Sequence, residues 1–212
     1  FRSSGYNVPH TVKASAFYHF NWGTNKLFTT TVGLIYQGQS GSPYSLVYSG
    51  DINGDNGTSN DLIFIPTDAQ VDQMQFLGTD AYTAEQQRAN LKQWLATTRY
   101  VKDHRGEYFE RYGDNLPFES HFDFHFGQKF GIRTGKYVHA LELTLDIMNV
   151  ANLLNKDWGR TFSSGYNSEF VSPITYKGDG VFQFANPSDM PLKYPSSYYS
   201  RWRGQVGLKY TF

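Results

Sequence analysis

The sequence contains no cysteine, so neither a disulfide framework nor a thiolate zinc site is available. It also lacks any run of eighteen apolar residues, and we therefore expect no membrane-spanning helix. Nineteen basic and nineteen acidic side chains leave no formal net charge, which argues against a polybasic nucleic-acid-binding protein. No phosphate-binding glycine loop, HExxH motif or nucleophile elbow occurs, so the sequence predicts a protein that is not an enzyme.

Aromatic residues and glycine are abundant instead, with 16 Tyr, 17 Phe, 4 Trp and 20 Gly. Together with many Thr, Ser and Asn, this composition is typical of β-rich proteins. The mean hydropathy is −0.53. A negative value is compatible with a membrane barrel, because half of each strand in such a barrel faces water and the loops are polar.

The last twelve residues alternate with a period of two, which predicts a β-strand with one apolar and one polar face. One set of alternate residues is apolar or aromatic except for a glycine: Trp202, Gly204, Val206, Leu208, Tyr210 and Phe212. The other set is polar, charged or glycine: Arg201, Arg203, Gln205, Gly207, Lys209 and Thr211. A strand of this length is near that needed to cross a bilayer at a tilt, with aromatic residues at both interfaces.

Similar alternation predicts five strands in all, at about 8–22, 26–48, 117–134, 137–150 and 201–212. Short turns join the first to the second and the third to the fourth, whereas long segments, 49–116 and 159–199, make the other two connections. The first long segment contains an expected helix at about 83–98, with Thr83 as its N-cap and Gln86 at the capping-box position.

This arrangement predicts an all-β fold, an antiparallel transmembrane β-barrel in which 49–116 and 159–199 are long extracellular loops. Five strands cannot close such a barrel, because about eight are the minimum. We therefore expect residues 1–212 to be the C-terminal portion of a larger barrel. The alternative from the strand pattern is a soluble β-sandwich.

The segment 51–61 resembles a calcium-binding loop, because carboxylate and amide oxygens at alternate positions can surround a hard cation. Its candidate ligands are Asp51, Asn53, Asp55 and Asp61, and Ca²⁺ is the one cofactor that the sequence suggests. The loop departs from the EF-hand pattern, since Asn56 stands at the glycine position and Leu62 at that of the bidentate glutamate. The alternative is a surface loop of Asx turns.

Two other groups of residues are candidate binding sites. The series Glu119, His121, Asp123 and His125 lies on one face of its strand and could chelate a metal, but a polar wall of a barrel lumen is the favoured interpretation. Aromatic residues of the second long loop could contact a ligand or a partner, although we expect most of them to pack the loop: Tyr166, Phe170, Tyr176, Phe182, Phe184, Tyr194, Tyr198 and Tyr199.

Several segments, in this order, resemble the C-terminal barrel of TonB-dependent outer-membrane receptors, in particular the Oar-like and SusC-like groups of Bacteroidetes. They are 9–15 (PHTVKAS), 36–44 (YQGQSGSPY), 51–55 (DINGD), 60–66 (NDLIFIP), 146–156 (DIMNVANLLNK) and 209–212 (KYTF). The resemblance implies a 22-stranded barrel with an N-terminal plug domain, of which this chain would be the last five strands.

By this resemblance the chain is expected in the cell outer membrane, as part of a receptor that imports a scarce nutrient. Its expected partners are outer-membrane lipid, the remaining barrel and plug, TonB through that remaining part, and a surface lipoprotein in SusC-like members. The sequence does not identify the substrate among oligosaccharides, peptides or chelates. The alternatives are a secreted carbohydrate-binding β-sandwich and a passive outer-membrane porin.

The barrel prediction assigns a face to each strand residue. The expected lipid-facing residues include Phe122, Phe124, Phe126, Leu141, Leu143, Leu145, Val206, Leu208 and Tyr210. The expected lumen-facing residues include Glu119, His121, Asp123, Glu142, Asp146, Arg203 and Lys209. We also expect the closing strand to pair with the 137–150 strand.

Overall fold

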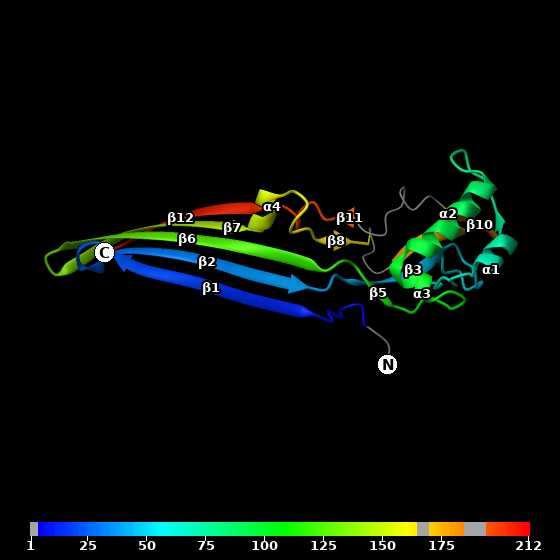
Figure 1. The fold of residues 1–212 in the computed structure, drawn as a ribbon, viewed down its shortest axis with the longest axis horizontal. Coiled ribbons are helices and arrows are strands. Elements are labelled where there is room, and N and C mark those ends of the chain that lie inside the picture. Colours follow the sequence, from blue (N-terminus) through cyan, green and yellow to red (C-terminus); the bar gives the residue numbers. More distant parts are fainter. Residues whose placement is uncertain (1–3, 165–169, 185–193) are drawn as a thin grey trace. The chain divides into compact units, whose positions relative to one another are not determined.

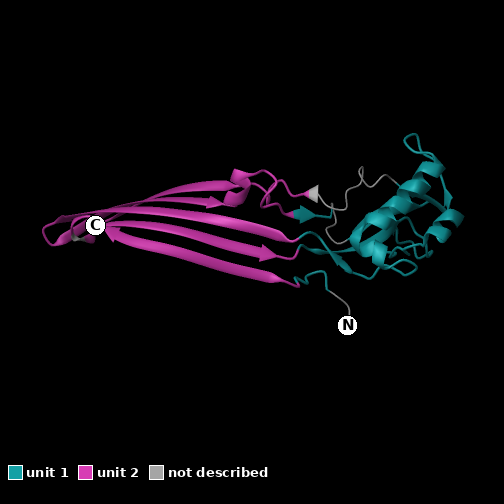
Figure 2. Ribbon diagram, in the orientation of Figure 1, with its two compact units in different colours: residues 1–8, 41–117, 162–194 teal, residues 9–40, 118–161, 195–212 magenta. Residues whose placement is uncertain are grey.

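The computed structural model describes residues 4–164, 170–184 and 194–212. The chain is mostly β and divides into two compact units (Figures 1 and 2). Unit 1 comprises residues 1–8, 41–117 and 162–194, and unit 2 comprises residues 9–40, 118–161 and 195–212.

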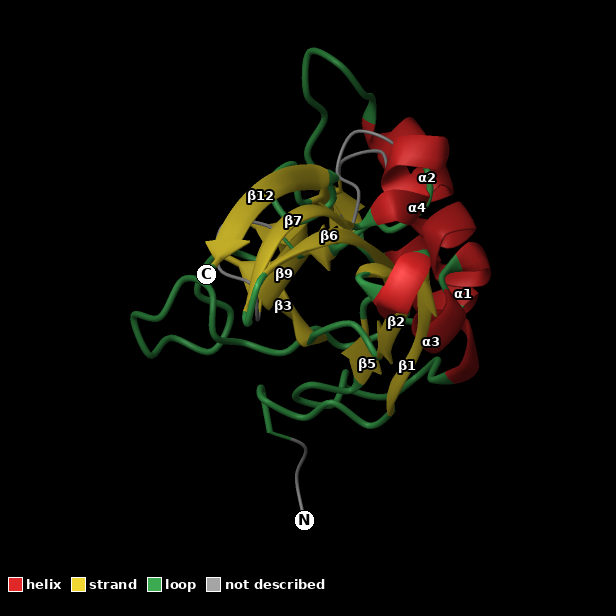
Figure 3. Cartoon of the chain, turned by 90° about the vertical axis from the view of Figure 1, so that its left-hand side faces the viewer, coloured by secondary structure: helices red, strands yellow, loops and turns green. Residues whose placement is uncertain are grey.

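Unit 2 is built on a five-stranded antiparallel sheet in the order β1-β2-β6-β7-β12. Its strands are β1 (Thr11–Trp22), β2 (Phe28–Gln39), β6 (Glu119–Thr134), β7 (Tyr137–Met148) and β12 (Arg203–Thr211). Figure 3, viewed along the strands, shows this sheet curved. The described strands do not close on themselves, because β1 and β12 are the two edges. The predicted β class is confirmed, as is the pairing of the closing strand with β7.

Short connections occur at one end of this sheet. The 3₁₀ turn Thr24–Lys26 joins β1 to β2, and the turn at Gly135 and Lys136 joins β6 to β7. Gly23 and Gly135 have positive φ angles, 78° and 62°, which glycine adopts without steric cost. At the other end the chain leaves the sheet after Gln39 and again after Met148. These two excursions supply the helix α4 (Val150–Leu154) and all of unit 1 except residues 1–8.

Unit 1 contains a second five-stranded sheet in the order β4-β10-β9-β3-β5. Its strands are β3 (Pro43–Ser49), β4 (Gln75–Phe76), β5 (Asp114–Asn115), β9 (Phe170–Tyr176) and β10 (Val181–Phe184). It also contains the helices α1 (Asp68–Gln73), α2 (Ala84–Thr97) and α3 (Arg99–Asp103) and the short strand β8 (Phe162–Ser163). Unlike the first sheet it is mixed, since β3 pairs with β9 in parallel and β10 with β4 in parallel. One further short strand is β11 (Tyr194–Pro195).

The structure differs from the expected element boundaries in two places. The predicted strand 26–48 divides into β2 and β3, which belong to different sheets. The segments expected as long loops, 49–116 and 159–199, contribute helices and strands to a packed unit with a buried apolar core. Its members are Tyr44, Leu46, Tyr48, Ile63, Ile65, Val71, Leu91, Trp94, Leu95, Val101, Phe109, Leu116, Ile174 and Phe184.

Capping boxes define the starts of α1 and α2. The Thr83 side chain accepts a hydrogen bond from the Gln86 N–H while the Gln86 side chain accepts one from the Thr83 N–H, which confirms the predicted helix start. Thr67 and Gln70 make the same pair of bonds at the start of α1.

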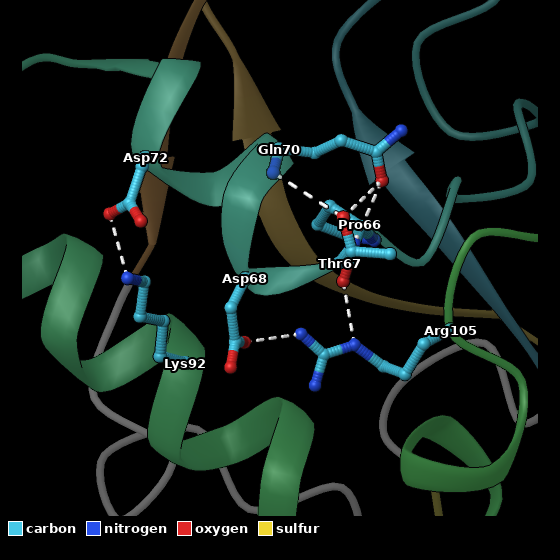
Figure 4. A network of polar contacts seen from close by, with 7 residues as sticks. All are labelled: Pro66, Thr67, Asp68, Gln70, Asp72, Lys92 and Arg105. Carbon is cyan, nitrogen blue, oxygen red and sulfur yellow. Dashed lines mark hydrogen bonds and ion pairs between the residues drawn. The ribbon is translucent and has the colours of Figure 1, made fainter.

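Two basic side chains hold α1 in place (Figure 4). Arg105 donates to the Pro66 carbonyl at 2.7 Å and to Asp68 at 2.5 Å. Lys92 of α2 reaches Asp72 of α1 at 2.7 Å. The helical layer of unit 1 is therefore fixed by capping and ion pairs as well as by apolar packing.

Candidate functional site

The apolar face of the unit 2 sheet is the most extensive surface feature of that unit. Cross-strand pairing aligns the apolar residues of all five strands. One row is Ala16, Leu34, Phe124, Ile147 and Gly204. The next row is Tyr18, Val32, Phe126, Leu145 and Val206. In a third row, Leu143 of β7 lies beside Leu208 of β12. Because side chains alternate along each strand, the nine residues expected to face lipid share this one face. The predicted partition of residues between the two faces is therefore confirmed, whereas contact with lipid stays a prediction.

The residues of this apolar face are exposed or half-buried. Val206 is 75% exposed and Leu208 68%, and Tyr18, Leu34 and Leu143 are also exposed, whereas Phe122, Phe124, Phe126 and Leu145 are half-buried. The buried apolar cluster found among the described residues lies wholly in unit 1. A continuous exposed apolar surface of this kind marks an interface with a protein or a membrane.

Aromatic rings gather where the short turns are. Trp22 stacks on Phe28 with ring centroids 4.9 Å apart, and Phe28 meets Phe130 edge-on at 5.9 Å. Tyr210 stacks on Phe212 at 5.9 Å near the same end of the sheet. Rings at the end of an apolar band are typical of the level at which a membrane meets water.

Three polar side chains interrupt the apolar face and satisfy one another. The Trp22 indole N–H donates to Thr30 Oγ1 at 2.9 Å, and the Thr30 hydroxyl donates to Gln128 Oε1 at 2.6 Å. The Gln128 amide donates in turn to the carbonyls of Thr29 and Lys129 at 3.2 and 3.0 Å. We call these three residues the polar triplet. Polar groups paired in this way can lie in an apolar environment at little cost.

The opposite face carries the charged residues, and several of them have a polar partner on a neighbouring segment. His125 Nδ1 lies 2.6 Å from Asp146 Oδ1, whereas His121 Nε2 lies 3.2 Å from the hydroxyl of Thr161. Asp123 accepts the Asn149 N–H at 2.7 Å. Glu119 and His121 approach each other, with Oε2 and Nε2 3.9 Å apart, but no three metal-ligating side chains of the described residues gather around one point, so the metal-chelating alternative for the series along β6 is not favoured.

The aspartate loop, residues 51–61, is held by its own side chains. Asp51 accepts the N–H groups of Gly54, Asp55 and Asn56 at 2.7, 3.1 and 2.9 Å. Asp61 accepts the Ile52 N–H at 3.2 Å. The carboxylates thus act as hydrogen-bond acceptors for backbone N–H groups of the loop, as in Asx turns.

An amide group stands between two carboxylates of this loop. Asn53 Nδ2 lies 3.1 Å from Asp55 Oδ2 and 2.6 Å from Asp61 Oδ1, and the Asn60 amide also donates to Asp55 at 3.0 Å. The Gly57 N–H and then the Asn53 side chain lower the pKa of the Asp55 carboxyl. The loop is therefore organised as a hydrogen-bonded turn.

Calcium binding by Asp51, Asn53, Asp55 and Asp61 stays a prediction. All four side chains belong to one hydrogen-bonded loop, but the Asn53 amide occupies the space between Asp55 and Asp61, so an ion placed there would have to displace it. In the part of the chain that is described, no three His, Cys, Asp or Glu residues are gathered around a point suitable for a metal ion.

Among the aromatic residues of the second long segment, some are packed and others are exposed. Phe184 is buried beside Trp94 at 5.7 Å, and Phe182 packs against Tyr176 and Tyr48 at 5.4 and 6.1 Å, in agreement with a packing role. Tyr198 and Tyr199, in contrast, are exposed. Tyr166 lies outside the described residues, as does the side chain of Tyr194.

A small hollow in unit 1 is lined by Asn60, Leu62, Arg111 and Phe170, with a volume of about 180 Å³. Pockets that enclose a drug-sized ligand hold about 300–1,000 Å³, so this hollow is too small to enclose one. The Arg111 guanidinium lies over the rings of Tyr112 and Phe170 at 5.3 and 5.8 Å.

Two hydrogen-bonded centres of the structure were not predicted from the sequence. Asn149 adopts a left-handed conformation with φ 55° and is buried at the end of β7, where its amide donates to the Gly159 and Ser200 carbonyls. Asparagine is among the few residues that tolerate this conformation, and this tolerance was the one available signal.

The second centre is a polar network in unit 1, in which Tyr44 and Asp114 are buried and Arg99 is exposed. The Tyr44 hydroxyl donates to Asp114 at 2.9 Å, and Arg99 contacts the other oxygen of the same carboxylate at 2.5 Å. Burial, together with the neighbouring Asp114 carboxylate, raises the pKa of Tyr44. No sequence signal joins these residues, because they are separated by up to 70 positions.

No helix among the described residues is long and apolar enough to cross a membrane. No model of a protein family, no curated protein and no solved structure matches this chain.

Proposed function

We propose that the unit 2 sheet is part of the wall of an antiparallel transmembrane β-barrel in the cell outer membrane. The observation that carries the proposal is the alignment of exposed and half-buried apolar residues across all five strands, opposite a face that carries the polar and charged residues. Lipid would cover the apolar face, and the polar face would line the lumen.

The dimensions of the sheet fit a bilayer. β1, β2 and β7 have twelve residues each. At a rise of about 3.4 Å per residue and a tilt of about 45°, such a strand spans roughly 29 Å along the membrane normal, close to the hydrocarbon thickness of about 30 Å. The aromatic rings of Trp22, Phe28 and Phe130 would then lie at one interface.

We further propose that this barrel is that of a TonB-dependent receptor that imports a nutrient. The support is the resemblance of segments 9–15, 36–44, 60–66 and 146–156 to the C-terminal barrel of that family. Short turns at one end of the sheet and large excursions at the other are in keeping with it. Unit 1 would then be formed from extracellular loops.

The barrel proposal is tested by a pair of adjacent substitutions in the full-length protein expressed in cells. Leu143→Arg places a charge on the apolar face and should cost about 2–4 kcal/mol at mid-membrane, which would sharply lower the amount of protein assembled in the outer membrane. Glu142→Gln, on the opposite face, should leave assembly near the unmodified level. Equal tolerance of the two substitutions would refute the assignment of faces.

The receptor proposal is tested by the gene sequence preceding residue 1. A plug domain followed by barrel strands is expected there. Barrel strands without a plug would favour the passive porin instead. A complete soluble domain, with residues 1–212 forming a cooperatively melting monomer in the absence of detergent, would favour the secreted carbohydrate-binding sandwich.

A further inference from the structure

The walls of the small hollow in unit 1 are fixed to the buried strand β3. Ser45 of β3 pairs with Phe170 at the start of β9, and the Ser45 hydroxyl accepts the Tyr112 N–H at 2.8 Å. Figure 3 shows β3 and β9 side by side. Two residues beyond Ser45, Val47 forms a β-bridge with Leu62. Three segments that are remote in sequence are thereby held on one strand, which positions their side chains more precisely than separate loops could.

Arg111, the residue before Tyr112, places a cation at this hollow. Its guanidinium lies over the rings of Tyr112 and Phe170. Such contacts stabilise a guanidinium while its N–H groups stay free to donate two parallel hydrogen bonds to a carboxylate. Arg111 is exposed, and it forms no ion pair with a carboxylate of the described residues. The hollow therefore holds an oriented cation that a ligand can reach from solvent.

The remaining walls are apolar except for one amide. Leu62 and Phe170 supply the apolar surface. The Asn60 amide nitrogen donates to Asp55 at 3.0 Å, and no described residue donates to its oxygen, which can therefore accept a hydrogen bond from a ligand. The volume of about 180 Å³ equals the share of about six water molecules in the liquid, at roughly 30 Å³ each. The hollow thus fits one end of a larger molecule.

The neighbouring aspartate loop restricts the charge of such a ligand. Asp55, whose pKa is lowered by the hydrogen bonds described above, remains ionised at neutral pH and is bonded to Asn60. Its negative charge beside the hollow disfavours anions that carry two charges, such as phosphate. A single carboxylate at Arg111, with an N–H group directed to Asn60, meets both requirements.

We propose that this hollow binds the C-terminal residue of a peptide that ends in an aliphatic side chain. Arg111 binds the terminal carboxylate, the Asn60 oxygen accepts the N–H of that residue, and Leu62 and Phe170 cover its side chain. The proposal concerns unit 1 and does not depend on the proposed barrel, so its failure would leave the Leu143 and Glu142 comparison unaffected.

The carboxylate is tested by titrating the full-length protein with N-acetyl-leucine, observed by ligand NMR. A ligand of this size should bind with a Kd on the order of 1 mM. N-acetyl-leucine amide, which has the same shape without the charge, should bind at least roughly tenfold more weakly, because Arg111 loses a charged partner. Equal binding of acid and amide, or no binding of the acid, would overturn the proposal without any substitution in the protein.

The role of Arg111 is tested by two variants and a matched control. Arg111→Gln should remove the preference for the acid over the amide, and Arg111→Lys should keep part of it, because lysine retains the charge but not the planar fork. Arg133→Gln removes an exposed guanidinium from unit 2 and should leave the preference unchanged. A preference that survives in Arg111→Gln, or that falls equally in Arg133→Gln, would contradict the assignment of the carboxylate to Arg111.

Two further ligands test the class of molecule. 4-Methylpentanoate keeps the carboxylate and the aliphatic chain but lacks the N–H group, so it should bind roughly fivefold more weakly than N-acetyl-leucine. Inorganic phosphate should not displace N-acetyl-leucine at equal concentration. Equal binding of 4-methylpentanoate would indicate a site for free carboxylic acids, and displacement by phosphate would indicate a general anion site; either result would overturn the assignment to a peptide terminus.

Discussion

The two units use the same kinds of residue in opposite ways. In unit 1, Phe109, Leu91 and Ile63 are fully buried among helices and a mixed sheet. In unit 2, Leu208 and Val206 stand exposed on a sheet with no apolar layer over them in the described structure. A unit that buries its apolar residues supplies its own stability in water, whereas the exposed face requires another apolar phase to cover it.

We expect the largest difference between the two units when an apolar side chain is shortened. Phe109→Ala removes a ring that is 1% exposed and should lower the free energy of unfolding of unit 1 by about 3–5 kcal/mol. Leu208→Ala removes apolar atoms that lipid would cover but leaves no cavity, so it should lower the free energy of unfolding of unit 2 by the transfer term alone, about 2 kcal/mol. Urea unfolding followed by the near-ultraviolet signal of the reconstituted protein measures both. Similar losses would mean that Leu208 also belongs to a packed core.

The next largest effect is expected at the buried hydroxyl of Tyr44. Tyr44→Phe removes the hydrogen bond to Asp114 and should cost about 1.5–3 kcal/mol, as for a bond to a charged group. The raised pKa of Tyr44 adds a pH dependence: its stabilisation is complete below the unfolded pKa of about 10 and falls as the pH rises through the folded-state value. Melting between pH 8 and 11 should therefore show a steeper decline for the unmodified protein than for Tyr44→Phe. Parallel curves would contradict this role.

Two neighbouring substitutions on β2 compare the polarity of the surroundings at the two faces of the sheet. Thr30→Val breaks the polar triplet and leaves the Trp22 indole and the Gln128 carbonyl without their partner, so it should cost about 1–3 kcal/mol in lipid vesicles. Thr29→Val removes one exposed hydrogen bond to Asn21 on the other face and should cost less than about 0.5 kcal/mol. Urea unfolding in vesicles compares them, and equal costs would show that the two faces have similar polarity around them.

The smallest predicted effect concerns helix capping in unit 1. Thr83→Ala should destabilise α2 by about 1 kcal/mol, because the Gln86 N–H loses its acceptor. Thr83→Ser, which keeps the hydroxyl, is the control and should remain close to the unmodified protein. Hydrogen exchange of the first turn of α2 measures the change, and unchanged protection in the alanine variant would rule out a capping contribution.

Local patterns were sufficient to predict the sheet of unit 2 and the start of α2 in unit 1. Alternation along β6, β7 and β12 assigned each side chain to a face, because a strand carries its period in consecutive residues. The capping pair Thr83 and Gln86 likewise lies within one helical turn, so the start of α2 could be predicted.

The sheet of unit 1 could not be predicted, because its contacts are remote in sequence and its strand β3 is buried on both faces. Six of the seven residues of β3 are buried, so the strand shows no alternation, and Ser45 pairs with Phe170, which follows it by 125 positions. The break before β3 depends on Gly41, where a Cβ atom would lie 2.6 Å from the carbonyl oxygens of Leu116 and Pro117. That close approach exists only in the folded chain.

The aspartate loop shows a different limit of sequence reasoning. Its residue types indicated a cluster of oxygen donors, and the structure brings Asp51, Asp55 and Asp61 into one loop with Asn53. The donors could be listed from the sequence, but the position of the Asn53 amide between two carboxylates depends on the path of the backbone.

The strand order of unit 1 determines how much of the chain must be synthesised before its sheet can form. β10 and β9 lie between β4 and β3, although they are encoded more than 50 residues after the last residue of the first excursion, Pro117. A ribosome that has released residues 41–117 has therefore produced two outer portions of a sheet whose centre does not yet exist. We therefore expect newly made chains to expose unpaired strands and an incomplete core until residues 170–184 emerge, and we expect truncation before that point to leave the same defects.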